Sequence, residues 1–119
     1  MAASDPMQFW PIEIRCNTER NKLNIRFDNG DQVELSAELL RVESPSAEVQ
    51  GHGPSQKKTP RDKRYVTITK ITAVGSYAVR LTFSDGHDTG IFSWDLLHDY
   101  GKRKKQLMAD YQKRLDSLG

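Results

Sequence analysis

The side chains best suited to chemistry lie around His87, which has Asp85 and Asp88 close by in the sequence. An imidazole with nearby carboxylates can ligate zinc or iron. The same residue types also satisfy backbone amides in tight turns. Two interpretations therefore stay open, a metal site that uses His87 with Asp85 or Asp88, and a hydrogen-bonded turn without a metal. His52, which lies between two glycines, is a further candidate ligand for the metal site.

No set of residues for catalysis stands out elsewhere in the chain. The single cysteine, Cys16, excludes a disulfide framework and a zinc cluster made only of cysteines. Cys16 lies in a segment of alternating apolar and polar residues, which favours a buried hydrophobic role. The glycines do not form a phosphate-binding loop, and no serine lies in a nucleophile-elbow motif. We therefore expect a protein that is not an enzyme.

The net charge of +2 conceals an uneven distribution of charge. Acidic residues outnumber basic ones over residues 1–50, and the reverse holds over residues 51–119. Residues 102–105, Lys-Arg-Lys-Lys, are placed by the sequence pattern at the start of a helix, where positive charge is unfavourable. Such a run can bind nucleic-acid phosphates or remain solvated, and it lacks interleaved aromatic residues that would stack on bases. Weak nucleic-acid binding through the basic half is one alternative function.

Much of the chain is expected to form two copies of one strand–turn–strand–helix unit. In each copy, alternating apolar residues end at a phenylalanine, Asn-Gly or Asp-Gly forms a tight turn, and a serine precedes a short helix. The copies comprise residues 23–40 and 77–97, and a further strand precedes each of them, at 11–16 and 65–71. These patterns predict an α+β fold with a small antiparallel sheet built from the two units.

Three segments are expected to lie outside these units. Residues 1–9 form a flexible lead-in, and residues 44–64 form a mobile loop because they are rich in Pro, Gly, Ser and charge. Residues 102–119 form an amphipathic helix, which Gly101 separates from the short helix before it. No apolar run reaches the length needed to span a bilayer, and residues 1–5 lack the features of a signal peptide. We therefore expect a cytoplasmic protein.

Residues 84–97, Ser-Asp-Gly-His-Asp-Thr-Gly-Ile-Phe-Ser-Trp-Asp-Leu-Leu, carry a specific resemblance to a known family. They resemble the signature of a small bacterial domain family of unknown function that is similar to the N-terminal domain of gamma-butyrobetaine hydroxylase. Residues 39–49 and 74–79 resemble this family too, and the similarity covers residues 10–101. The resemblance implies an α+β domain with an antiparallel sheet and short helices. In the hydroxylases this domain precedes the domain that holds iron and 2-oxoglutarate.

The resemblance also implies where a metal would bind. The hydroxylase domain holds zinc through a Cys-Pro-Cys-x-x-Cys-like segment and a distant histidine, and the matching positions here are Ser44, Ser46, Val49 and His87. Only the histidine is retained. Hydroxyl groups are poor zinc ligands and an isopropyl group is none. We therefore expect that the family zinc site, and any bound zinc or iron, is absent.

The same resemblance implies a role in binding other proteins, since such domains also occur attached to P-loop carriers of iron–sulfur cluster assembly. We expect a non-catalytic interaction module whose partner is an iron–sulfur carrier or an oxygenase. The candidate contact surface comprises His87, Asp88, Phe92 and Trp94, because aromatic residues are favoured anchors in interfaces. The alternative is that Phe92 and Trp94 belong to the core.

Overall fold

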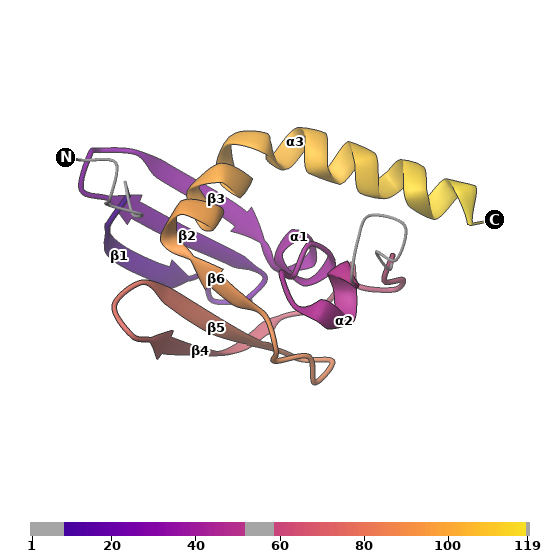
Figure 1. Cartoon of the computed structure of the whole chain (residues 1–119), viewed down its shortest axis with the longest axis horizontal. Helices are drawn as coiled ribbons and strands as arrows, with labels where there is room; N and C mark the ends of the chain where they lie inside the picture. The colour runs from indigo at the N-terminus through magenta and orange to yellow at the C-terminus, as the bar shows by residue number, and fades with distance from the viewer. Residues whose placement is uncertain (1–8, 52–58, 119) are drawn as a thin grey trace.

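A computed structural model describes residues 9–51 and 59–118 (Figure 1). It contains two three-stranded antiparallel sheets, in the orders β1-β2-β3 and β4-β5-β6. The strands are β1 Pro11–Cys16, β2 Lys22–Phe27, β3 Gln32–Ser36, β4 Ile68–Val74, β5 Ala78–Phe83 and β6 Ile91–Ser93. The helices are α1 Ala37–Val42, α2 Ala47–Gln50 and α3 Trp94–Ser117. The predicted α+β class is confirmed, although the strands form two small sheets.

The two predicted units have closely matching hairpin turns. Gly30 and Gly86 close the β2–β3 and β5–β6 hairpins with φ values of 94° and 91°. Glycine adopts this left-handed conformation without steric cost. In each hairpin the phenylalanine before the turn, Phe27 or Phe83, donates its amide to the carbonyl four residues later, over 2.8 and 2.9 Å. The repeat read from the sequence is therefore a repeat in three dimensions.

The two units also begin their helices in the same way and then diverge. The Ser36 hydroxyl accepts the Leu39 amide over 3.0 Å at the start of α1, and the Ser93 hydroxyl accepts the Leu96 amide over 3.2 Å at the start of α3. Whereas α1 ends at Val42, α3 runs without interruption to Ser117.

The prediction that Gly101 separates two helices is wrong, since Gly101 lies inside α3. A Cβ atom on Gly101 would lie 2.4 Å from Cγ1 of Val33. Its role is therefore to let α3 pack closely against β3, as Figure 1 shows for the two elements. The helical residues on both sides, and the packing of α3 on β3, outweigh the cost of one glycine in a helix, which is about 1 kcal/mol.

The basic run 102–105 consequently lies in the interior of α3 and not at its start, contrary to the prediction. Arg103 forms an ion pair with Asp99 one turn earlier, at 2.7 Å, and Lys104 donates to the carbonyl of Glu34 over 3.0 Å. Because the run is not at a helix N-terminus, the argument that its position is electrostatically unfavourable no longer holds.

The core lies between the two sheets and under α3, and it is built from the inward-facing residues of the strands. Phe9, the last residue of the predicted lead-in, belongs to it: its ring stacks on His98 of α3 at 3.6 Å between centroids. His98 is buried, and its Nε2 lies 2.7 Å from Oδ2 of Asp31 in the first hairpin.

Among the described helices, none combines the length and the apolar character needed to cross a bilayer.

Candidate functional site

The beginning of the predicted mobile loop is folded. Ser44 is completely buried and Ser46 nearly so, and helix α2 follows at Ala47–Gln50. The side-chain amide of Gln50 donates to the carbonyl of Ser44 over 2.9 Å. The burial of the two serines and this hydrogen bond within the segment offset the entropy cost of ordering a polar segment, which composition alone does not reveal. Residues 52–58, and with them the candidate ligand His52, lie outside the described part of the chain.

His87 joins this segment to the second hairpin. Its Nε2 lies 2.9 Å from Oγ of Ser44 and 3.4 Å from Oγ of Ser46, and its Nδ1 lies 3.8 Å from a carboxylate oxygen of Glu48. Gly90 makes room for this contact, because a Cβ atom there would lie 2.3 Å from Oγ of Ser44. Burial and then the nearby Arg41 guanidinium lower the pKa of His87, which favours the neutral imidazole.

The positions that the family resemblance assigns to zinc therefore do meet, but their residues do not fit the metal. Ser44 and His87 hydrogen-bond directly to each other, Ser46 adds a second hydroxyl, and Val49 has no donor atom. Zinc in proteins takes thiolate, imidazole or carboxylate ligands. Within residues 9–51 and 59–118, no three His, Cys, Asp or Glu side chains are arranged to hold a metal ion.

A serine beside a histidine is also the arrangement that activates a nucleophile. Here the Ser44 side chain has no exposed surface, so its Oγ is closed to a substrate in this conformation. The geometry indicates a structural role: the hydrogen bond between Ser44 and His87 holds the segment before α2 against the β5–β6 hairpin.

Asp85, a candidate metal ligand, instead binds two cations. One oxygen, Oδ2, lies 2.7 Å from Nε of Arg41 and 2.6 Å from Nζ of Lys63, while Oδ1 accepts the amide of His87 over 3.1 Å. Burial by itself would raise the pKa of Asp85. The hydrogen bonds from Lys63, His87 and Arg41 outweigh this effect and hold the pKa well below its ordinary value.

The substitution Asp85→Asn is expected to change how the free energy of unfolding depends on pH. A carboxyl group whose pKa is lower in the folded state stabilises the protein above its unfolded pKa of about 4, and this contribution is lost as the pH falls below that value. The free energy of unfolding should therefore be higher for wild type than for Asp85→Asn at pH 6, and the difference should shrink towards pH 2. Urea titrations at several pH values measure it. A difference that stays constant with pH would contradict this account.

The structure corrects the predicted contact surface. Phe92 is completely buried and Trp94 is only 7% exposed, and the indole nitrogen of Trp94 donates to the carbonyl of Ser76 over 2.9 Å. His87 is also buried, so Asp88 alone of the four residues is exposed. Phe92 and Trp94 are thus core residues, because the short strand β6 turns Phe92 inward and α3 begins against the protein body.

Three other large side chains near the start of α3 are exposed. Trp10 is 41% exposed, Tyr77 47% and Ile91 45%. Ile91 begins β6, and Tyr77 directly precedes the β5 residue that pairs with the last residue of β6. No local pattern in the sequence places Trp10 near the start of α3, because it directly follows the predicted lead-in.

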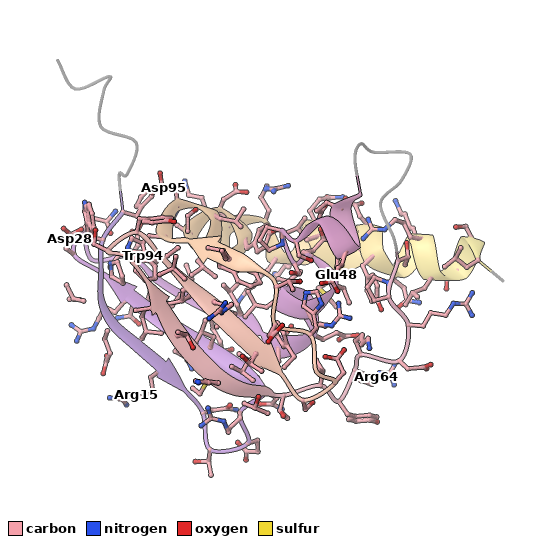
Figure 2. All side chains as sticks on the ribbon, turned by 60° about the horizontal axis from the view of Figure 1, so that its bottom comes forward. Arg15, Asp28, Glu48, Arg64, Trp94 and Asp95 are labelled. Carbon is pink, nitrogen blue, oxygen red and sulfur yellow. The ribbon has the colours of Figure 1, made fainter. Side chains whose placement is uncertain are left out.

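Hydrogen bonds link the neighbourhoods of two of these residues, Trp10 and Tyr77, to the first turn of α3. The amide of Phe9, next to Trp10, donates to the Asp95 carboxylate over 3.3 Å, and the amide of Trp94 donates to the carbonyl of Tyr77 over 3.3 Å. Figure 2 shows Trp94 and Asp95 at one end of the molecule, far from Glu48. We refer to Trp10, Tyr77 and Ile91 as the apolar patch.

Comparisons with known proteins agree with the expected family. The model for the family "Gamma-butyrobetaine hydroxylase-like, N-terminal" matches residues 14–98. None of the curated proteins matches the chain.

Similar solved structures include two NMR solution structures. One has a TM-score of 0.81 and 43% identity, with 96% of this chain and 85% of that chain covered. The other has a TM-score of 0.79 and 42% identity, with 95% and 89% covered. A third is the crystal structure of a protein of unknown function from Acidithiobacillus ferrooxidans, assigned to the DUF971 family. It has a TM-score of 0.60 and 37% identity, with 73% and 86% covered.

Proposed function

This chain belongs to the gamma-butyrobetaine hydroxylase-like N-terminal domain family, and on that premise we propose that it is a non-catalytic module that binds a protein partner through the apolar patch. The partner classes that the family resemblance suggests are an iron–sulfur carrier protein and an oxygenase. The observation that carries the proposal is that Trp10 and Tyr77, both exposed, lie beside hydrogen bonds to the start of α3, and that Ile91, also exposed, lies three residues before it.

The chemistry of the patch supports this role. Trp and Tyr are enriched at the centres of protein interfaces, where they supply a large contact area with few rotatable bonds. The amide of Phe9, which donates to the Asp95 carboxylate, and the amide of Trp94, which donates to the Tyr77 carbonyl, hold the two aromatic residues on the folded body. A patch that is already formed loses little conformational entropy when a partner binds, so more of the contact energy contributes to affinity.

The proposal is tested by placing a photo-crosslinking amino acid at Trp10 or at Tyr77 in the full chain. Tyr65 is the matched control, because it is an aromatic residue with 85% exposure that lies outside the patch. In extract of the native host, the two patch positions should each give the same discrete crosslinked protein, and position 65 should not. Mass spectrometry identifies the protein and shows whether it belongs to one of the two proposed classes.

The affinity of the identified partner, measured with purified proteins, provides the quantitative test. The double substitution Trp10→Ala, Tyr77→Ala should weaken binding by about 30-fold or more, since a single interface hot spot contributes about 2 kcal/mol or more. Tyr65→Ala should leave it unchanged. Equal crosslinking from position 65, or an affinity that the double substitution does not alter, would refute the patch as the contact surface.

A further inference from the structure

A pocket of about 440 Å³ lies between α1, α2 and the segment after residue 58. Among the described residues, its wall includes three cationic side chains, Arg41, Arg61 and Lys63, and one carboxylate, that of Glu48. Its volume lies within the range of about 300–1,000 Å³ that is typical of sites for small molecules. In Figure 2 Glu48 lies away from Trp94 and Asp95, which are at the left of the view.

One wall residue, Arg41, has hydrogen-bonding capacity that the protein leaves unused. Its Nε binds Asp85, but its Nη1 is buried and has no hydrogen-bond partner within the described residues. A buried donor without an acceptor costs about 1–3 kcal/mol, and more for a charged group, so native structures rarely leave one unpaired. No described residue accepts from this nitrogen, so the Arg41 guanidinium keeps hydrogen-bonding capacity beside the pocket.

The charges around Arg41 favour an anion as the acceptor. Asp85 is bound by both Arg41 and Lys63, so a single carboxylate balances two cations. Arg61 adds a third positive charge. The Glu48 carboxylate in the wall is largely exposed and accepts a hydrogen bond from the hydroxyl of Thr89 over 2.7 Å. Asp85 holds Arg41 and Lys63 in place but neutralises only one of their two charges, so the pocket keeps an excess of positive charge.

We propose that this pocket binds the phosphate group of a small phosphorylated molecule, with Arg41, Lys63 and Arg61 as the binding residues. Guanidinium groups donate two hydrogen bonds to phosphate oxygens, and the ammonium of lysine adds a point charge. The hydroxyl of Thr59, also in the wall, is a further donor. The pocket volume exceeds that of a phosphate group alone, which leaves room for the group that carries it.

The test compares two probes with the same carbon skeleton, glycerol 3-phosphate and glycerate, by NMR titration of the isotope-labelled full chain at low ionic strength. Glycerol 3-phosphate should bind saturably and about tenfold more tightly than glycerate, with shifts concentrated at Arg41, at residues 59–63 and at His87. Equal affinity for the two probes would overturn the assignment to phosphate. Shifts centred on the apolar patch, or no saturable binding of glycerol 3-phosphate, would overturn the site.

Variants at neighbouring positions separate this site from a diffuse effect of charge. Arg61→Gln and Lys63→Gln should each weaken the binding of glycerol 3-phosphate by about tenfold. Arg64→Gln, the matched control, removes the same charge from an exposed residue that does not line the pocket, and it should have little effect. Glu48→Gln should strengthen binding, because it removes a negative charge from the wall.

Equal losses in Arg61→Gln and Arg64→Gln would show general electrostatic attraction and refute the site. The inference does not depend on the proposed partner. Substitutions in the apolar patch should leave the binding of glycerol 3-phosphate unchanged.

Discussion

Gly101→Ala is expected to destabilise the protein by about 2 kcal/mol, although alanine is the better helix former. In an unobstructed helix the substitution would gain about 1 kcal/mol. Here the new Cβ would lie 2.4 Å from Cγ1 and 2.6 Å from Cβ of Val33, which is closer than atoms can pack. Either α3 moves away from β3 or the strand shifts, and overpacking of this kind costs about 1–3 kcal/mol beyond the lost gain in propensity.

The double substitution Val33→Ala, Gly101→Ala identifies the cause. Val33→Ala removes the contact with Cγ1 but keeps the Val33 Cβ at 2.6 Å from the new Cβ. The clash is therefore relieved in part, and the double variant should be more stable than the sum of the two single effects predicts, by about 1 kcal/mol. Urea unfolding of the four proteins in the cycle measures this coupling. Ala109→Gly, at an exposed position of α3, reports the propensity effect without a clash. Strictly additive effects would show that the packing of α3 against Val33 does not explain the glycine.

Trp94→Ala is expected to have the largest effect, a loss of about 3–5 kcal/mol in the free energy of unfolding. Trp94 is 7% exposed, and its side chain also contributes a hydrogen bond to the carbonyl of Ser76. Domains of this kind have a total stability of about 5–15 kcal/mol, so the variant should be close to unfolding. Trp10→Ala is the matched control: because Trp10 is 41% exposed, its loss should cost much less.

Circular dichroism during urea unfolding measures both effects. Fluorescence adds an independent readout, since the chain has two tryptophans and each variant retains one. The remaining Trp94 of Trp10→Ala should emit at shorter wavelength when folded than the remaining Trp10 of Trp94→Ala. A Trp94→Ala variant as stable as wild type would revive the hypothesis that Trp94 is a surface anchor.

The sequence by itself determined the local structure of the two units. Asn29-Gly30 and Asp85-Gly86 required tight turns, and Ser36 and Ser93 marked helix starts, because each of these signals acts within a few residues. The alternation of apolar residues likewise predicted the strands and the inward faces of β2 and β5. Ser44, Ser46, Val49 and His87 were aligned by family resemblance, and the fold does bring them together.

Only the tertiary structure decided what those residues do. Gly101 interrupts a helical pattern in the sequence, but its reason lies in Val33, 68 residues earlier. Phe92 and Trp94 could have been anchors or core until the position of β6 and the start of α3 buried them. The pocket around Arg41, Lys63 and Asp85 draws on three separate parts of the chain. Burial, close packing and ion pairing depend on contacts between distant segments, and no local pattern encodes them.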